Sequence, residues 1–389
     1  MTATRPRILI VTRNFPPLRG GMERLLHHVH LSLREQYSTA IVGPAGCQDH
    51  LEPGTAFSCC PPMPPARFLI HCQLRTCGMA MRFRPDLILA GSGVTAPAAR
   101  LAGTLVRAPV ACFAHGLDLV VPNLGYRLGF LPAIRSCDRV IVNSQSTARI
   151  AIDTGVAPSR IRILHPGVHI PSSPDYRPDG SLFRESIGAG ARPILLSVGR
   201  LTERKGIVQF IDHCLPEIAA RIPEILYVVI GNEPKHALNG GTGMLRRILQ
   251  TVKERRLQEH VLIIREADDA LLWQAYAASQ LFIFPVMERP GDVEGFGMVA
   301  VEAAAHGLPT VAFATGGVVD AVKDGVSGYL IRPGDYVGMT RAVENHLAGG
   351  QGKGLSASCL QFSERFSWDL FGRHLRKICS ETITSDGRI

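Results

Sequence analysis

The sequence predicts an α/β protein with two doubly wound, Rossmann-like domains, each built on a parallel sheet. Three observations support this prediction. The chain has 389 residues, which is more than one hydrophobic core usually holds. Short apolar runs alternate with helix-patterned stretches along most of its length. A segment rich in Pro, Gly and Ser, residues 171–190, separates two such series and is the expected linker.

The first series of strands lies in residues 1–170, the expected N-terminal domain. It begins with the apolar run Arg7–Thr12, and a helix-patterned stretch follows. Further strands are predicted at Thr39–Val42, Asp86–Ala90, Pro109–Phe113, Arg139–Val142 and Arg162–Leu164. Because helical patterns separate most of these strands, we expect the strands to be parallel.

The second series begins directly after the linker and predicts a C-terminal Rossmann-like domain over residues 191–365. Its strands are predicted at Pro193–Val198, Leu226–Ile230, Val261–Ile264, Gln280–Pro285 and Pro309–Phe313. After Gly328 we expect two helical segments to end the chain.

Composition narrows the class of protein. The ten cysteines are scattered without a C-x-x-C pair, so we expect neither a disulfide framework nor a zinc site. No apolar run approaches the roughly 18 residues of a membrane-spanning helix, and the start MTATRPRILIVT is too short for a signal peptide. We therefore expect a cytoplasmic protein that is soluble or peripheral to a membrane.

The charge is unevenly divided. Residues 1–170 contain 18 Arg, no Lys and 8 acidic residues, a net charge of +10, whereas the rest of the chain carries −1. Such a domain suits an anionic partner, although a basic, Arg-rich genome composition explains it equally well. Arg67–Arg84 alternates Arg with apolar residues, which is typical of an amphipathic helix on an anionic bilayer or of a helix packed on a sheet. No nucleic-acid-binding motif occurs, so we expect no nucleic acid partner.

The most informative stretch is Glu288–Thr315. There a predicted strand leads into a loop with Glu294-Gly-Phe-Gly, a helix begins near Met298, and Glu302 follows eight positions after Glu294. The unpaired N–H groups of a helix N-terminus favour an anion. Carboxylates accept hydrogen bonds from hydroxyls, so the stretch predicts a ligand in which a phosphate is joined to a polyol.

Two further loops predict phosphate contacts. Gly199-Arg-Leu-Thr-Glu-Arg-Lys205-Gly follows a predicted strand, and Arg200 and Lys205 are two cations that suit a diphosphate. Gly20-Gly21 precedes the first predicted helix, with Glu23 in its first turn.

One loop near the end of a predicted strand contains Ala114-His115-Gly-Leu-Asp118. Ligands of open α/β sheets bind outside the carboxyl ends of strands, so His115 is placed to meet substrate. Gly91-Ser-Gly93-Val-Thr-Ala96 matches a dinucleotide fingerprint, but it follows a late strand rather than the first one. A nicotinamide oxidoreductase is therefore a disfavoured alternative.

Taken together, these motifs resemble those of the family-4 retaining glycosyltransferases of the GT-B fold (glycosyltransferase group 1). The resemblance rests on the E-x7-E phrase with Ala303-Ala-Ala-His-Gly-Leu-Pro309 and Gly316-Gly317, on G-R-L-x-x-x-K-G, on GG-x-E and on H-G-x-D. It implies that the two domains face each other across a cleft, with acceptor bound by the first and donor by the second. It also implies that residues 366–389 form a helix that crosses back to the N-terminal domain.

The resemblance implies specific roles. His115 meets the donor sugar near the reacting centre, Arg200 and Lys205 contact the donor diphosphate, Glu294 and the Phe296/Gly297 backbone bind sugar hydroxyls, and Glu302 holds the ribose. The other implied donor contacts are Gly20, Gly21, Gly199, Gly231, Met298 and Val299. Glu23 and Asp118 are expected to support the site or the acceptor. Gly231-Asn-Glu-Pro departs from the commoner G-x-G-P, which leaves the base open, and Arg265 is a candidate neighbour of that base.

The function we expect is transfer of a hexose or deoxyhexose, with retention, from a nucleoside-diphosphate sugar to a glycan or lipid-linked acceptor. We place it in bacterial surface polysaccharide synthesis (lipopolysaccharide, capsule or exopolysaccharide), with peripheral contact to anionic lipid at the inner face of the cell membrane. No Asp-x-Asp occurs, so no metal or other cofactor is expected. For retention we favour front-face attack over Glu294 as a covalent nucleophile. The alternatives are a sugar-nucleotide epimerase of the same fold and a non-catalytic nucleotide-sugar-binding protein.

Overall fold

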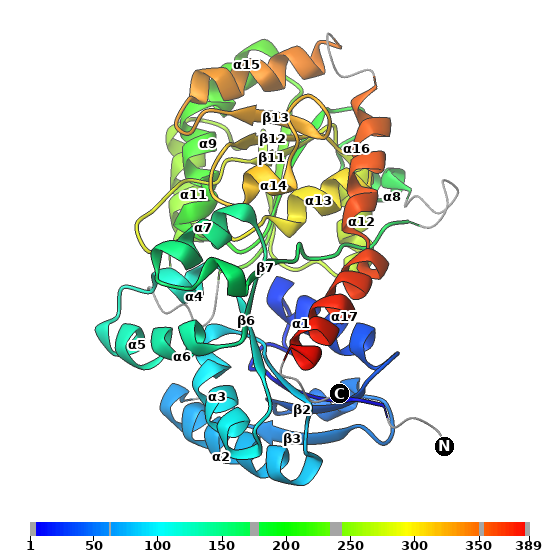
Figure 1. Ribbon diagram of the computed structural model, residues 1–389. Coiled ribbons are helices and arrows are strands. Elements are labelled where there is room, and N and C mark those ends of the chain that lie inside the picture. The colour runs from blue at the N-terminus through cyan, green and yellow to red at the C-terminus, as the bar shows by residue number, and fades with distance from the viewer. Residues whose placement is uncertain (1–4, 62–63, 172–178, 234–242, 350–353, 386–389) are drawn as a thin grey trace. The chain divides into compact units, whose positions relative to one another are not determined.

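The computed structural model describes residues 5–61, 64–171, 179–233, 243–349 and 354–385. The chain divides into two compact units. The first comprises Met1–Gly167 with Trp368–Ile389, and the second comprises Val168–Ser367. Each unit has one parallel sheet with helices on both faces, as Figure 1 shows, so the predicted fold class is confirmed.

The sheet of the first unit has seven strands in the order β3-β2-β1-β4-β5-β6-β7. Their bounds are β1 Arg7–Val11, β2 Ser38–Pro44, β3 Ala56–Cys60, β4 Leu87–Ala90, β5 Val110–Ala114, β6 Arg139–Val142 and β7 Ile161–Ile163. Neighbouring strands pair in parallel, with Arg7 opposite Ser38 between β1 and β2. The sequence did not predict β3, an edge strand that is only partly buried.

Helices cover both faces of this sheet. One apolar cluster packs α2 (Pro65–Phe83), α3 (Ala96–Val106), α6 (Leu131–Ser136) and α7 (Gln145–Asp153) against it. A second cluster packs α1 (Gly21–Leu33) and α17 (Trp368–Thr384) against the other face. Short segments complete the unit: α4 Leu117–Val120, α5 Leu124–Gly129, and the 3₁₀ turns η1 Cys47–His50, η2 Gly93–Thr95 and η3 Pro158–Arg160.

The last helix, α17, belongs to the first unit although it lies at the end of the chain. The Trp368 ring stacks on that of His28 with 3.7 Å between centroids. Arg376 Nη1 donates to the Ser32 carbonyl of α1 at 2.9 Å. These contacts join α17 to α1.

The sheet of the second unit has six strands in the order β10-β9-β8-β11-β12-β13. Their bounds are β8 Ile194–Val198, β9 Leu226–Ile230, β10 Val261–Ile264, β11 Leu281–Phe284, β12 Thr310–Phe313 and β13 Gly328–Ile331. The expectation of two helical segments after Gly328 is wrong. Strand β13 comes first, paired with β12, and three helices follow, because Gly328-Tyr-Leu-Ile is too short a run to reveal its strand period.

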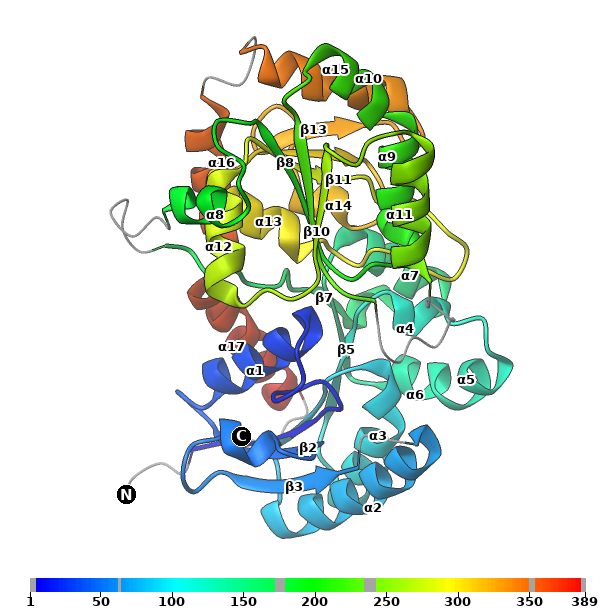
Figure 2. The same ribbon diagram turned by 180° about the vertical axis from the view of Figure 1, so that it is seen from behind.

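Two helical layers cover the second sheet (Figure 2). One face carries α8 Gly180–Ser186, α12 Asp269–Ala278, α13 Met298–Ala305, α14 Val318–Ala321 and α16 Leu355–Ser363. The other carries α9 Ile207–His213, α10 Leu215–Arg221, α11 Met244–Glu254 and α15 Tyr336–Leu347. The 3₁₀ turns are η5 Glu203–Lys205 and η6 Glu364–Phe366.

Part of the expected linker is ordered structure of the second unit. Helix α8 buries Phe183 and packs along α12, where a Cβ on Gly180 would lie 2.6 Å from the Ala278 nitrogen. Residues 172–178 lie outside the described residues.

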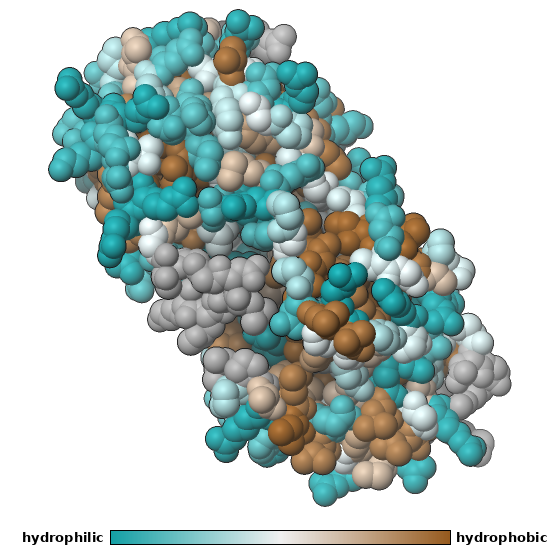
Figure 3. Space-filling view, turned by 90° about the vertical axis from the view of Figure 1, so that its left-hand side faces the viewer, coloured by the Kyte–Doolittle hydropathy of each residue, from teal (hydrophilic) through white to brown (hydrophobic). Residues whose placement is uncertain are grey.

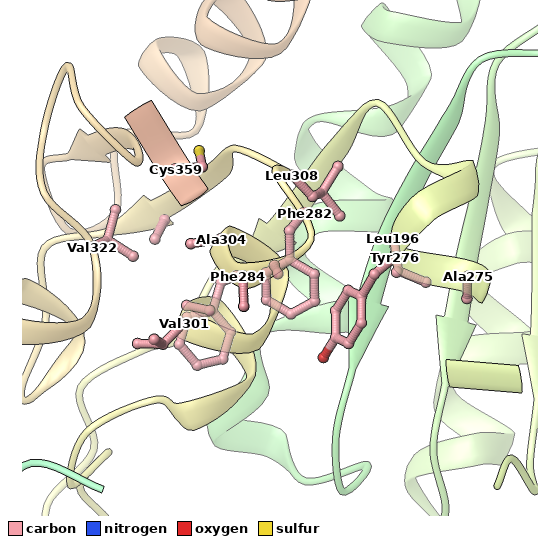
Figure 4. Packing of buried hydrophobic residues seen from close by; sticks show 14 of the residues in the cluster. Leu196, Ala275, Tyr276, Phe282, Phe284, Val301, Ala304, Leu308, Val322 and Cys359 are labelled. Atoms are coloured by element: carbon pink, nitrogen blue, oxygen red, sulfur yellow. The ribbon is translucent and has the colours of Figure 1, made fainter. Parts of the chain in front are cut away.

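Helix α13 lies close to the second sheet because its inward face is small. Ala303, Ala304 and Ala305 are fully buried. Figure 4 shows Phe282 and Phe284 of β11 beside Val301 and Ala304 of α13. Small side chains let the helix backbone approach the sheet, and this packing sets where the helix begins.

Candidate functional site

The loops after β8 and β11 meet at the carboxyl edge of the second sheet, because these strands are direct neighbours. The loop after β8 contains Arg200 and Lys205, and the loop after β11 leads to Glu294 and the start of α13. The carboxyl edge of a parallel sheet is where ligands of open α/β folds bind. The sequence therefore predicted three residues that the structure brings onto adjacent loops.

Glu294 is held by two cations. Its side chain is 13% exposed, and its Oε2 accepts from Lys205 Nζ at 2.6 Å and from Arg204 Nη1. Burial by itself would raise the pKa of Glu294, but the attraction of Lys205 and Arg204 outweighs burial and lowers the pKa to about 2. Glu294 is thus an ionised, firmly positioned carboxylate. The resemblance implied a contact with sugar hydroxyls and gave no indication of this ion pair.

Lys205 lies in an environment with excess positive charge. Its side chain is 13% exposed, and Nζ is 4.8 Å from the centroid of the Phe284 ring. Burial lowers the pKa of Lys205, the charges of Arg204 and Arg200 act in the same direction, and Glu294 opposes them. An additional anion beside Lys205 would therefore be stabilised.

Arg204 is a site residue that the sequence analysis missed. Its side chain is 8% exposed, Nε donates to Asp292 Oδ1 at 2.8 Å, and Nη1 donates to Glu294. Its carbonyl accepts from the Met287 N–H at 2.8 Å. The only signal in the sequence is a second Arg directly before Lys205, which the motif G-R-L-x-x-x-K-G treats as variable.

Arg200 occupies a different position from Lys205. It is exposed, and it lines a small pocket together with Gly199, Lys205, Phe284 and Pro285. An exposed guanidinium and a buried ammonium beside one pocket can contact different parts of one anionic ligand.

Gly199 and Gly231 lie where the backbones at the ends of β8 and β9 come close together. The Gly199 N–H donates to the Ile230 carbonyl at 3.0 Å, and a Cβ on Gly231 would lie 1.8 Å from the Gly199 oxygen. Glycine at 231 therefore lets the ends of β8 and β9 approach each other. Glu233 accepts from the N–H groups of Gly243 at 2.7 Å and Leu245 at 3.1 Å, so it caps the start of α11. Pro234 lies outside the described residues.

The predicted residues at the start of α13 differ in whether a ligand could reach their backbone or their side chain. Gly297 is the N-cap at φ 97°, a conformation that favours glycine, and Met298 and Val299 begin the helix and are partly buried. The Phe296 side chain is 2% exposed, with its ring 5.5 Å from that of Phe366. Phe296 can therefore offer a ligand its backbone but not its ring.

Glu302 is bound quite differently from Glu294. Its carboxylate accepts from the Tyr276 hydroxyl at 3.2 Å. Its carbonyl accepts from His306 Nδ1 at 2.8 Å, since a carbonyl cannot donate. The two carboxylates of the E-x7-E phrase thus have separate environments.

Gly316 and Gly317 brace the loop that carries Glu294. The Gly317 N–H donates to the Glu294 carbonyl at 2.8 Å. A Cβ on Gly317 would lie 2.0 Å from the Gly295 oxygen, and one on Gly316 would lie 2.8 Å from the Glu294 oxygen. The paired glycines are needed for this close backbone contact.

In the first unit, Gly20 and Gly21 are exposed at the start of α1. Gly20 is the N-cap, and among the described residues no side chain caps this end of the helix. Glu23 accepts from Asn14 Nδ2 at 2.7 Å. A Cβ on Gly20 would lie 2.3 Å from Glu23 Oε2, so the glycine makes room for this carboxylate. The arrangement leaves backbone N–H groups available to an anion.

His115 follows β5 and has a defined orientation. Its Nε2 donates to the Gly91 carbonyl at 2.9 Å, and Asp118 Oδ2 accepts from the His115 backbone N–H at 3.1 Å. In the tautomer that makes this bond, Nδ1 is the acceptor. Asp118 therefore shapes the His115 loop.

The glycines of the dinucleotide-like fingerprint face protein. A Cβ on Gly91 would lie 2.7 Å from Thr12, and one on Gly93 would lie 2.7 Å from Ile134 and from the Tyr126 hydroxyl. The space that a dinucleotide fingerprint keeps open for a pyrophosphate is filled by side chains here. This observation removes the support for nicotinamide binding.

Comparison with known proteins identifies the family. A model described as Glycosyltransferase Family 4 matches residues 19–170, and one described as Glycosyl transferases group 1 matches residues 181–353. A D-inositol 3-phosphate glycosyltransferase of Mycobacterium leprae is 30% identical over 304 residues, 75% of this chain and 67% of that protein. A GDP-mannose-dependent alpha-(1-6)-phosphatidylinositol monomannoside mannosyltransferase of Mycolicibacterium smegmatis is 27% identical over 359 residues, 88% of this chain and 89% of that protein.

Solved structures show the same fold. HepE of Anabaena, solved in complex with UDP-glucose, superposes with a TM-score of 0.78 at 21% identity, covering 96% of this chain and 99% of that chain. The family models together span most of the chain, and the fold agrees with them. The chain therefore belongs to the family-4 glycosyltransferases (glycosyl transferases group 1) and has the GT-B fold.

Proposed function

We propose that this glycosyltransferase takes its sugar from a nucleoside-diphosphate sugar bound by the second unit, and that it retains the anomeric configuration. One observation supports this donor most directly: in the part of the chain that the structure describes, the three cations Arg200, Arg204 and Lys205 lie near two carboxylates, Asp292 and Glu294, beside the start of α13. A diphosphate would supply the negative charge that this group lacks. Its attached sugar would place hydroxyl donors near Glu294.

The roles we propose for the residues are those that the family resemblance implies. Arg200 and Lys205 neutralise the diphosphate, with the N-terminus of α13 at Met298 and Val299 contributing its N–H groups. Glu294 and the backbone of Phe296 and Gly297 bind sugar hydroxyls. Glu302 holds the ribose.

Gly199 and Gly231 bring backbone close to the nucleotide, while Gly20, Gly21 and His115 of the first unit take part in donor binding and catalysis. Glu23 and Asp118 support those loops through the hydrogen bonds described above.

Glu294 is better suited to binding than to nucleophilic attack. Its Oε2 already accepts from two cationic donors, which reduces its reactivity toward carbon. We therefore favour front-face attack, in which the leaving phosphate oxygen takes the proton of the acceptor hydroxyl as the new glycosidic bond forms. Removal of one preorganised contact to the leaving group typically reduces kcat by about a hundredfold.

The donor can be found by a screen. The curated relative named above uses GDP-mannose, and HepE was solved with UDP-glucose, so GDP- and UDP-sugars are the first to test. The nucleotide sugar that raises the melting temperature most is then incubated with enzyme, and release of nucleoside diphosphate is measured. Glu302→Ala should abolish turnover in a folded protein. An unchanged rate would favour a non-catalytic nucleotide-sugar-binding protein, and epimerisation of the donor without acceptor would favour an epimerase.

We propose that transfer needs no divalent metal. Two basic side chains beside one pocket, Arg200 and Lys205, are available to the diphosphate, and the sequence lacks the Asp-x-Asp that commonly bridges a cation to it. Turnover in EDTA should equal turnover in Mg²⁺. Loss of activity in EDTA that Mg²⁺ restores would contradict this proposal.

The acceptor we propose is a glycan or a lipid-linked glycan of bacterial surface polysaccharide synthesis, reached at the inner face of the cell membrane. Among the described residues, no helix is long and apolar enough to cross a bilayer. Helix α2 packs Phe68 and Cys72 inward and exposes apolar residues beside exposed Arg residues. The exposed residues are Ile70, Leu74 and Met81 with Arg67, Arg75 and Arg82.

We expected the Arg67–Arg84 segment to form a helix that lies on an anionic bilayer or a helix that packs on the sheet, and one helix can do both. Figure 3 shows brown apolar surface interrupted by teal polar residues in its lower part. The exposed residues of α2 can insert apolar side chains into a bilayer while the Arg residues beside them contact anionic headgroups. Sedimentation with anionic vesicles should exceed that with neutral ones and should fall with salt. Equal, salt-independent binding to both would contradict membrane contact.

A further inference from the structure

The contacts of Glu294 raise a question about donor binding. Lys205 and Arg204 both donate to the same oxygen of Glu294, in a group of side chains that is almost fully buried. A donor phosphate would attract Lys205 because the cations exceed the carboxylates here. As Lys205 turned toward the phosphate, it would weaken its hold on Glu294. A buried carboxylate without a counter-ion is strongly disfavoured, so another cation must hold Glu294 for the site to keep its charge.

Arg204 meets this requirement by its geometry. Asp292 Oδ1 accepts from Nε at 2.8 Å, which fixes the plane of the guanidinium and directs Nη1 at Glu294. The Arg204 carbonyl accepts from the Met287 N–H at 2.8 Å. Arg204 thus contacts the loop between β11 and α13 at three places, and its guanidinium cannot follow Lys205 without breaking the bonds to both Asp292 and Glu294.

We infer that Arg204 is a positioning residue that remains the counter-ion of Glu294 when Lys205 turns to the donor diphosphate, and that Asp292 holds Arg204 in that role. This inference rests on the proposed function, because it assumes a diphosphate beside Lys205. The charged groups that bear on Glu294 and Lys205 are Arg204 and Arg200 from the loop after β8, and Asp292 from the loop after β11.

The inference makes a specific prediction about protons. In Arg204→Gln, Glu294 keeps only Lys205. When a diphosphate draws Lys205 away, Glu294 loses its last cation, and its pKa rises. The variant should therefore take up a proton on binding diphosphate at about pH 6, and its affinity should fall more steeply with rising pH than that of wild type. A residue that merely supports the fold would not produce proton uptake.

The experiment uses the full chain and isothermal titration calorimetry with GDP and UDP, taking the one that binds wild type. Titrations in buffers of different ionisation enthalpy give the protons taken up per diphosphate bound. We expect Arg204→Gln to bind at least tenfold more weakly at pH 7.5 and to take up close to one extra proton at pH 6. Arg204→Lys, which keeps a cation, should suppress the extra proton uptake.

Two further variants serve as controls. Arg247→Gln is the matched control, since Arg247 pairs with Glu203 at 3.3 Å and is exposed. Its affinity should stay within twofold of wild type. In Arg204→Gln/Glu294→Gln the extra proton uptake should vanish, because the titrating carboxyl is gone.

Thermal unfolding without ligand reports folding. If Arg204→Gln does not fold, Asp292→Asn, which releases the guanidinium, replaces it with the same expected direction. Unchanged affinity and no extra proton in a folded Arg204 variant would overturn the inference. A different result would overturn the proposed function itself: diphosphate binding that is equally strong in Lys205→Met, or no binding of either diphosphate by wild type.

Discussion

The negative charge of Glu294 should stabilise the second unit at neutral pH and lose this effect in acid. The pKa of Glu294 is lowered from 4.5 to about 2, which corresponds to about 3 kcal/mol in favour of the folded state. Because the folded state has the lower pKa, this contribution is complete above pH 4.5 and declines as the pH falls from 4.5 toward 2. Glu294→Gln also leaves Lys205 and Arg204 buried without this partner. At pH 7 its free energy of unfolding should therefore fall by about 3 to 5 kcal/mol.

The two tryptophans allow the unfolding free energy of each unit to be measured separately. Trp273 lies in α12 of the second unit and Trp368 in α17 of the first. In a Trp368→Phe background, tryptophan fluorescence during urea unfolding reports the second unit alone. The loss caused by Glu294→Gln should be largest at pH 7 and smaller at pH 3.5. Equal unfolding midpoints at pH 7, or a difference that does not shrink in acid, would refute the reasoning.

A matched control separates this buried ion pair from a surface one. Glu203 pairs with Arg289 and Arg247, but its side chain is 40% exposed. Solvent screens such pairs, so Glu203→Gln should cost less than about 1 kcal/mol at pH 7.

Three other predictions follow from the same contacts. Lys205→Met should lower kcat by about a hundredfold in initial-rate assays. Because the pKa of Lys205 is lowered, the diphosphate affinity of the wild type should decline with rising pH before the pH reaches the ordinary range of a lysine; a pH-independent affinity would argue against Lys205 as the contact. Gly317→Ala places a Cβ 2.0 Å from the Gly295 oxygen, so it should lower the free energy of unfolding in urea by about 1–3 kcal/mol. The control is Gly78→Ala in α2, where a Cβ meets nothing within 4 Å, and this variant should not destabilise the protein. Equal effects of the two variants would contradict the steric argument. Leu74→Glu should reduce sedimentation with anionic vesicles while leaving turnover of a water-soluble acceptor unchanged, and unaltered sedimentation would remove α2 as the contact.

The strands next to the site were predictable because they are almost entirely buried. β11 is a continuous apolar run and β8 is interrupted only by Ser197, so the charged residues that follow both strands stand out. β3 and β13 are partly exposed edge strands that contain weak strand formers, Ser58 in β3 and Gly328 in β13. The edge strand β10 is just as exposed, but it was predicted because Val261–Ile264 is an unbroken run of apolar residues. In such short strands, apolar and polar residues need not alternate clearly, so the two-residue period of a strand is hard to detect in the sequence.

The contacts of Arg204 were not predictable from any local pattern. Arg204 lies 88 residues before Asp292, and the two meet only because β8 and β11 are neighbours in the sheet. Sequence periodicity reports on neighbours along a helix or strand, whereas this pair depends on sheet order. Gly231 shows a related limit: the sequence marks it as special, but only the structure shows that the Gly199 backbone requires it.

The two glutamates of the E-x7-E phrase also constrain the mechanism. A paired-carboxylate mechanism like that of many glycosidases needs one carboxyl to act as a general acid, with its pKa raised. Glu294 is shifted in the opposite direction by Lys205 and Arg204, so it cannot supply a proton near neutral pH. Glu302 accepts a hydrogen bond from the Tyr276 hydroxyl, so the two carboxylates are held in different ways. The ionised Glu294, held by two cations, argues against a paired-carboxylate mechanism in which it acts as the acid. It is consistent with the front-face attack that we propose, in which cations at the diphosphate assist the leaving group.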